Sequence, residues 1–152
     1  MAFLSSLNIP LSGITAQRFR LDIISQNVDN AHNFYTTAEE AYKRQMVVFE
    51  EDKTFKRILR HHMGEGEAYM FKYKQLKGVM AARVVDDPTP PEPVYSPNNP
   101  LADEFGYVYE ANVDVQIEEM DAMEAQRSLD ANVAMYQAMQ SMIQASLSLG
   151  KG

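Results

Sequence analysis

The chain has 152 residues, 45% of them hydrophobic, which allows one domain with a modest core. The net charge of -7 argues against a nucleic-acid partner, because binding to a phosphate backbone normally shows as clustered Lys and Arg. The absence of cysteine excludes disulfides, thiolate metal sites and a cysteine nucleophile. No stretch approaches the roughly 18 consecutive apolar residues of a membrane span. The N-terminus lacks the basic start and apolar run of a cleaved secretory signal, so we expect no cleavage there.

Apolar residues near the N-terminus recur at alternating spacings of three and four, which predicts one face of a helix. We expect this helix to begin around residues 8–10, where Pro10 is tolerated in a first turn, and to end near Ala31. Arg18 occupies the one position that breaks the series. The apolar series consists of Leu4, Leu7, Leu11, Ile14, Leu21, Ile24 and Val28.

The same helix carries an unusual number of neutral amides. Asn and Gln can bond across a packed helix interface without the desolvation cost of a charge, or they can simply face water. Both interpretations remain open from the pattern alone. The amides are Gln17, Gln26, Asn27, Asn30 and Asn33.

The C-terminal region, from about Val115 to Leu149, contains neither proline nor glycine, and predicts one helix of roughly 30 residues, about 45 Å long. Met135, Met139 and Met142 fall on a face offset from the main apolar series. Methionine is a common gap-filler in ordinary cores, but a helix that is apolar on two sides has surface left for an assembly interface. The main series consists of Leu129, Val133, Tyr136, Ile143 and Leu147.

The centre of the chain changes to a period of two. Residues 43–50, 68–75 and 78–87 read as strands, with Gly64 and Gly66 supplying a turn, so we expect a small antiparallel β unit over residues 43–86. Six of the seven prolines follow, between residues 88 and 100. This composition predicts an extended segment outside helix and sheet, either a linker or a strap packed along another element.

The predicted fold class is therefore α+β, with long N- and C-terminal helices paired as an antiparallel coiled coil, a small β-rich central insert and a proline-rich extended strap. Residues 1–35 and 112–152 would form the helical core domain. Residues 36–87 would form the insert, and residues 88–111 the strap.

Candidate chemistry is sparse. His61 and His62 are followed by Glu65 and Glu67, but adjacent residues cannot imitate histidines one helical turn apart, and no third ligand is spaced to join them. The acidic residues around the strap lack the alternation and central glycine of a calcium loop. Phosphate-binding and nucleophile-elbow motifs are missing as well. We therefore predict no catalytic, cofactor-binding or metal residues and no small-molecule substrate.

Several stretches carry a resemblance to a known family. Residues 12–17 ("SGITAQ"), 26–31 ("QNVDNA") and 42–45 ("YKRQ") resemble the N-terminal signature of bacterial flagellar axial proteins. This signature is shared by several rod and hook subunits, so it does not choose among them.

The strap and the C-terminal helix narrow the resemblance to the proximal rod proteins of the flagellar basal body. The similar stretches are 95–103 ("YSPNNPLAD"), 106–108 ("GYV"), 112–114 ("NVD"), 119–120 ("EM") and 125–133 ("AQRSLDANV"). The chain departs from the usual family residue at Asp29, Asn99, Ala111 and Leu129.

The resemblance implies a non-enzymatic structural subunit. Such proteins are exported through the flagellar secretion apparatus without signal cleavage, and assemble with copies of themselves and other rod proteins into a hollow shaft. That shaft lies in the periplasm, starts at the export gate and membrane ring, transmits motor torque and forms part of the export channel. The terminal helices would form its inner layer, and the central insert would face outward.

Two sets of residues follow from these expectations. The predicted helix-pair core comprises Leu11, Ile14, Leu21, Ile24, Val28, Leu129, Val133, Tyr136, Ile143 and Leu147. The predicted subunit-interface residues are Gln17, Gln26, Asn27, Asn30, Arg127 and Asn132.

Two alternatives remain open. The first is a different rod or hook subunit of the same flagellar system. The second is a peripheral membrane protein that uses the N-terminal amphipathic helix, although that helix offers mainly Arg18 and Arg20 where membrane-surface helices are usually rich in basic residues.

Overall fold

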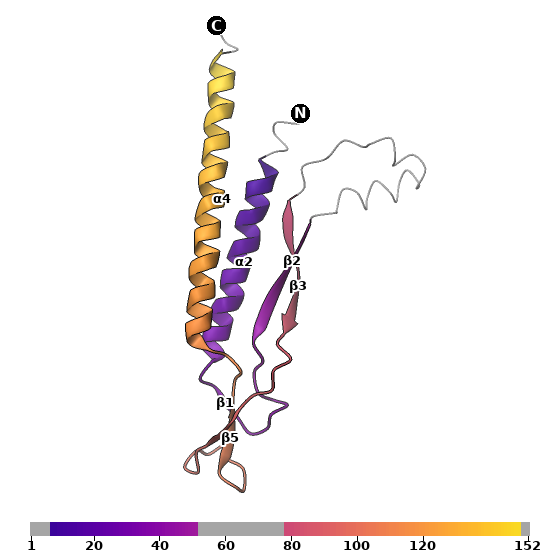
Figure 1. The fold of residues 1–152 in the computed structure, drawn as a ribbon, viewed down its shortest axis with the longest axis vertical. Coiled ribbons are helices and arrows are strands. Elements are labelled where there is room, and N and C mark those ends of the chain that lie inside the picture. The colour runs from indigo at the N-terminus through magenta and orange to yellow at the C-terminus, as the bar shows by residue number, and fades with distance from the viewer. Residues whose placement is uncertain (1–6, 52–77, 150–152) are drawn as a thin grey trace, which may run out of the picture.

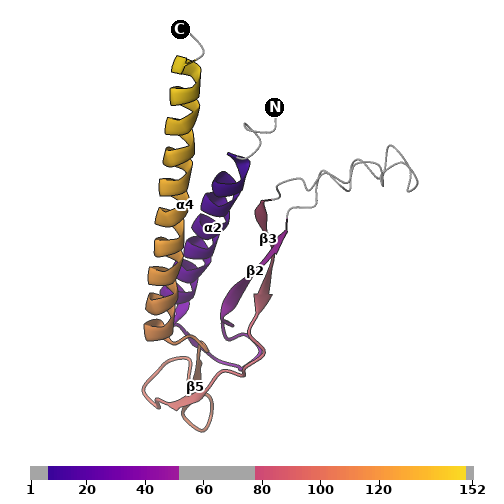
Figure 2. The ribbon, with the colours of Figure 1, turned by 45° about the horizontal axis from the view of Figure 1, so that its top comes forward.

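Two long helices dominate the computed structural model, which describes residues 7–51 and 78–149 (Figure 1). α2 spans Asn8–Asn30, and α4 spans Val115–Leu149. The helices lie side by side and run in opposite directions. Figure 2, a view turned by 45°, shows α2 between α4 on one side and a β-hairpin on the other. The α+β class expected from the sequence is confirmed.

Local sequence features explain where α2 begins and ends and where α4 begins. Pro10 lies in the first turn of α2, where a backbone N–H would have no intrahelical partner in any case. At the other end, the Ala31 N–H bonds to the Val28 carbonyl oxygen at 3.2 Å. α4 starts after Asp114, whose Oδ1 accepts the backbone N–H of Gln116 at 2.9 Å and so acts as an N-cap. The expected helix boundaries are confirmed.

The β-hairpin beside α2 is formed by β2 (Gln45–Glu51) and β3 (Val79–Asp86). The two strands pair antiparallel along their full length, with one shift of register between Val48 and Phe49. These strands match the expected segments 43–50 and 78–87. The expected strand at 68–75 and the turn at Gly64 and Gly66 lie outside the described residues.

A second, smaller sheet lies at the base of the helix pair, where α2 ends and α4 begins (Figure 1). It contains β1 (Phe34–Tyr35), β4 (Pro93–Tyr95) and β5 (Tyr107–Glu110), in the order β1-β5-β4 and all antiparallel. The proline-rich stretch of residues 88–100 was expected to lie outside helix and sheet, and that expectation is wrong for Pro93–Tyr95, which form β4.

Proline position explains the difference. Pro93 is the first residue of an edge strand, where the missing N–H costs no ladder hydrogen bond. β5 contains no proline and can occupy the centre of the sheet. Between the two strands, Gly106 adopts a φ of +82° that favours glycine, and an added Cβ would lie 3.0 Å from the Tyr95 ring. Tyr95 and Tyr107 meet edge to face above this turn, with ring centroids 5.3 Å apart.

The described part of the chain buries few large apolar side chains. Five of its eight buried hydrophobic residues are alanines, and the others are Ile23, Ile24 and Val108. By contrast, Phe105 is 79% exposed and Met120 is 66% exposed. Much apolar surface is therefore left over for contacts outside the chain.

Candidate functional site: helix-pair surface and polar junction

The predicted helix-pair core is only partly covered within one chain. Ile24 is buried, whereas Leu11 and Leu147 are exposed, at 49% and 63%. Leu11 and Leu147 therefore do not belong to the buried core of the single chain. The remaining seven are half-buried: Ile14, Leu21, Val28, Leu129, Val133, Tyr136 and Ile143.

The helices approach each other closely at Gly13. A Cβ added to Gly13 would lie 2.8 Å from Cγ and Oδ1 of Asn132, which is closer than a real Cβ contact allows. The Asn132 amide donates to the Ser128 carbonyl oxygen in its own helix at 2.9 Å. Asn132, predicted to contact other subunits, thus packs against α2 of its own chain.

We expect Gly13→Ala to weaken the helix pair, because the new methyl group must displace the Asn132 amide. Asn132→Ala in the same chain should recover most of the lost stability by vacating that space, so the two changes should be non-additive. Gly13→Val should be worse, because a larger, branched side chain needs more of the space that the Asn132 side chain occupies. Denaturant unfolding of the four chains of the double-mutant cycle measures the coupling, and simple additivity would contradict this packing.

A polar junction ties the base of the helix pair to β2. We use this name for Arg20, Asn27, Tyr42, Arg44, Glu118 and Asp121. The cluster joins α2, α4 and the segment that leads into β2, so it fixes three elements that lie far apart in the sequence.

Asn27 is at the centre of this junction and is 1% exposed. Its Nδ2 donates to the Gln45 carbonyl oxygen at 2.9 Å and to Glu118 Oε2 at 3.0 Å. Its Oδ1 accepts the Tyr42 hydroxyl and the Gln45 N–H, each at 2.9 Å. All four hydrogen-bonding positions of the amide are used inside the chain. Asn27 was predicted to contact a neighbouring subunit; within the single chain its amide is buried and hydrogen-bonded at every position.

Glu118 brings a buried carboxylate to the same place, with 0% exposure. Arg44 compensates it, donating from Nε to Glu118 and from Nη2 to Asp121 Oδ2 at 2.8 Å. Arg20 reaches Asp121 Oδ1 from α2 at 3.2 Å. Burial would lower the pKa of Arg44, but the hydrogen bond and charge of Glu118, with help from Asp121, outweigh burial and raise it above its ordinary value. The arginine therefore remains charged in the folded chain.

The junction also reaches the proline-rich segment. The Arg44 N–H donates to Asn112 Oδ1 at 2.6 Å, and the Asn112 amide donates to the Thr89 carbonyl oxygen at 2.8 Å. Thr89 in turn bonds Asp87 through its hydroxyl and its N–H, and these two hydrogen bonds lower the pKa of Asp87. The start of residues 88–111 is therefore attached, through Asn112, to the segment that leads into α4.

Tyr42 makes the junction sensitive to alkaline pH. Burial raises its pKa, and the negative charges of Asp86 and Glu118 raise it further. A raised folded-state pKa means that the neutral phenol contributes stability below pH about 10, and that this contribution is lost as pH rises through the folded-state pKa. Tyr42→Phe should cost about 1 kcal/mol near neutral pH, by removing one hydrogen bond to Asn27. It should also flatten the decline in unfolding free energy above pH about 10. Denaturant unfolding at pH 7 to 11 measures both effects; an unchanged alkaline decline in Tyr42→Phe would contradict the assignment.

The other predicted interface residues lie outside this junction. Gln26 and Arg127 are exposed, and the Asn30 amide donates to the Gln26 carbonyl oxygen at 2.7 Å. Gln17 is half-buried, and its Oε1 accepts no hydrogen bond within the described part of the chain. The structure does not gather these four side chains into one site.

The C-terminal half of α4 has a distinct surface. Its last charged residue is Asp130, and none of residues 131–149 is charged. Met135, Met142 and Leu149 are nevertheless exposed. Within the described ranges, neither helix combines the length and apolar character needed to cross a membrane. No described cluster of His, Asp and Glu could hold a metal ion, and His61 and His62 lie outside the described residues.

Sequence reasoning missed the polar junction. It quoted Tyr42 and Arg44 only as part of a family signature, and did not single out Glu118 or Asp121. One signal was available: Glu118 lies in the first turn of α4 and Asp121 about one turn further on, so the two carboxylates share a helix face. Nothing local, however, indicates that these groups meet.

No protein-family model matches this chain, but individual known proteins are similar to it over almost its whole length. The chain is 34% identical over 151 residues to the flagellar basal-body rod protein FlgC of Salmonella typhimurium, covering 99% of this chain and 100% of that protein. It is 33% identical over 159 residues to FlgC of Bacillus subtilis and 34% identical over 151 residues to FlgC of Escherichia coli O157:H7, with the same coverage. With these similarities at full length, the chain belongs to the FlgC family of flagellar basal-body rod proteins.

Proposed function

We propose that this chain is a structural subunit of the proximal rod of the flagellar basal body. It assembles with copies of itself and with other rod proteins into a hollow shaft that transmits motor torque and forms part of the export channel. The observation that carries the proposal is the full-length similarity to FlgC rod proteins from distant bacteria. The chain acts mechanically, not as an enzyme.

The surface of the chain supports an assembling role. Apolar side chains such as Met123, Met135 and Leu147 are more than half exposed in the single chain, which favours their burial against other subunits. Because a shaft is built from repeated head-to-tail contacts, different faces of one subunit must meet different neighbours. Gln17, Gln26, Asn30 and Arg127 remain our candidates for polar contacts on these faces.

The polar junction is suited to a subunit that transmits mechanical force. We propose that residues 1–35 and 112–152 form an inner layer of coiled helices, that residues 36–87 face outward, and that residues 88–111 connect the two. The charge-assisted bonds of Arg44 to Glu118 and Asp121 join the helices to the start of β2. Such bonds have a defined direction and resist sliding better than apolar contacts alone. Torque on the inner helices would thus be passed to the outer unit.

We further propose that the chain is exported through the flagellar secretion apparatus without cleavage, and that it lies in the periplasm near the export gate and the membrane ring. N-terminal sequencing of the chain recovered from basal bodies tests the first point. A sequence that starts well after Ala2 would contradict it.

The central experiment is deletion of the gene from its own bacterium, followed by purification of basal bodies. We expect loss of motility, basal bodies that lack a rod, and restoration of both by the full chain. Immunolabelling should place the restored chain at the base of the rod. Label at the hook or distal rod would instead indicate a different axial subunit, and label on the membrane in cells without basal bodies would contradict the proposal.

A further inference from the structure

α4 is much longer than its partner helix. Gly13 lies opposite Asn132, Arg20 lies opposite Asp121 and Glu124, and Asn27 lies opposite Glu118. This antiparallel register places the start of α2 opposite about residue 137. Residues 138–149, which we call the overhang, therefore extend about 18 Å beyond the start of α2. Figure 1 shows α4 continuing past the start of α2.

The overhang is suited to burial. It contains no charged residue, and Met142 and Leu149 within it are 56% and 84% exposed. Its serine hydroxyls already have partners in the helix backbone: Ser141 bonds the Gln137 carbonyl oxygen at 3.0 Å, and Ser146 bonds the Met142 carbonyl oxygen at 2.9 Å. Covering the overhang would thus desolvate neither a charge nor an unpaired hydroxyl.

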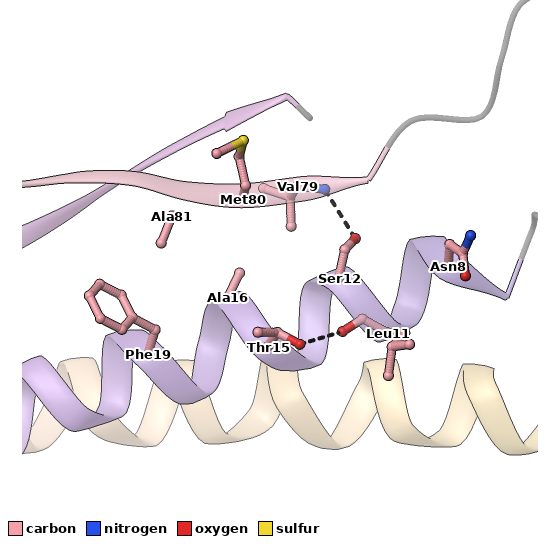
Figure 3. Close-up of a pocket in the computed structure, with 9 residues that line it drawn as sticks. All are labelled: Asn8, Leu11, Ser12, Thr15, Ala16, Phe19, Val79, Met80 and Ala81. Carbon is pink, nitrogen blue, oxygen red and sulfur yellow. Dashed lines mark hydrogen bonds between the residues drawn. The ribbon is translucent and has the colours of Figure 1, made fainter. Parts of the chain in front are cut away.

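A groove of about 620 Å³ lies between α2 and β3. The Ser12 hydroxyl accepts the Val79 N–H at 3.1 Å and holds the two elements together at one end of it (Figure 3). The lining is free of charged side chains, and runs along α2 from Asn8 to Phe19, about 18 Å of helix. Its apolar part consists of Leu11, Ala16 and Phe19 from α2 with Val79, Met80 and Ala81 from β3.

The groove lies on the side of α2 that faces β3, and its lining includes no residue of α4. Figure 3 shows α2 between β3 and the ribbon of α4. In the register above, Thr15 in the groove lies opposite about residue 130, so the overhang of its own chain begins about 12 Å further along the axis of a straight helix on the other side of α2. An overhang that enters the groove must therefore come from another copy.

We propose that the overhang of one copy docks in the α2–β3 groove of the next copy. The two surfaces match in length, in their lack of charge and in apolar character, and each is unpartnered within the described part of the chain. This contact is head to tail, so repeating it produces a ring or a helical array, as a shaft requires. The inference rests on the proposed rod function and adds the surfaces through which copies meet.

The chain has no cysteine, so introduced cysteines are unique probes. Two tagged chains of different size, one carrying Thr15→Cys and the other Met142→Cys, are to be expressed together in the deletion strain. Basal bodies are then treated with a short bifunctional maleimide. We expect a covalent dimer that contains both tags. Ser25→Cys, at an exposed position of α2 outside the groove, replaces Thr15→Cys as the matched control and should give no dimer.

Motility of each strain shows first that the variant chains are incorporated. If Met142→Cys does not swim, Ala145→Cys, at an exposed small residue of the same overhang, takes its place. Incorporated chains that form no mixed dimer, or form it equally with Ser25→Cys, would overturn the docking proposal and leave the rod function intact. Absence of the unmodified chain from basal bodies would instead refute the rod function itself.

Discussion

A strain whose only copy of this chain carries Ile24→Asp is expected to be non-motile, with basal bodies that lack the chain. Ile24 is 7% exposed and lies in α2, which contacts both α4 and the hairpin. An aspartate there would be a buried charge without a partner, at a cost of about 3 to 5 kcal/mol. Since the whole stability of a small domain is only about 5 to 15 kcal/mol, this is enough to prevent stable packing.

Ser25→Asp is the matched control, because Ser25 is the next residue of the same helix but is exposed. Val133→Asp, at a half-buried position of α4, should give the same defect in a milder form. Immunoblots of whole cells should show normal expression of all three variants, while circular dichroism of the purified chains should show a weaker helical signal and a lower melting temperature only for those at Ile24 and Val133. Normal swimming of both would contradict the structure of the helix pair.

Arg44→Met is expected to be as damaging as Ile24→Asp, because it leaves a buried carboxylate without its compensating cation. Arg44 is the cation that compensates Glu118, whose side chain is 1% exposed. Removal of one partner of a buried ion pair leaves an unpaired charge and costs about 3 to 5 kcal/mol. We therefore expect a large fall in the free energy of unfolding of the purified chain, and loss of motility in the cell.

A second change, Glu118→Gln, distinguishes the cost of the unpaired charge from the cost of lost packing. Adding Glu118→Gln to Arg44→Met removes the stranded charge while keeping the side-chain shape, so it should restore part of the lost free energy of unfolding. Arg83→Met, at an exposed position of β3, provides the control for loss of an arginine and should change stability little. If the double variant were no more stable than Arg44→Met alone, the buried carboxylate would not be the source of the cost.

The amides of the first helix show where sequence reasoning reached its limit. Their number suggested that they serve subunit interfaces, whereas Asn27 forms its hydrogen bonds inside its own chain: Glu118, one of its partners, is 91 residues away in the sequence. Asn132 likewise packs against Gly13 of its own chain. Gln26, which immediately precedes Asn27 in the sequence, is exposed. Neighbours in the sequence thus have opposite environments, which a count of amides cannot distinguish.

The proline-rich segment shows a second limit. Its composition correctly indicated an absence of helix, but proline prevents strand pairing only where a ladder N–H is needed. Pro93 occupies an edge where none is needed, and residues 107–110 pair with strands on both sides. Whether a position is an edge or a centre depends on which strands come together, and this is not encoded locally.

The sequence by itself determined the two helices and the strands β2 and β3, because periodicity, caps and proline placement act over a few residues. Its short motifs determined the family resemblance. The tertiary structure alone decided which polar groups meet, how far α4 extends beyond α2 and which apolar surfaces remain open. These features depend on the antiparallel register of the helices. That register is set by the close contact at Gly13 and by the bonds of Asn27, Arg44 and Glu118, whose partners come together only when the whole chain folds.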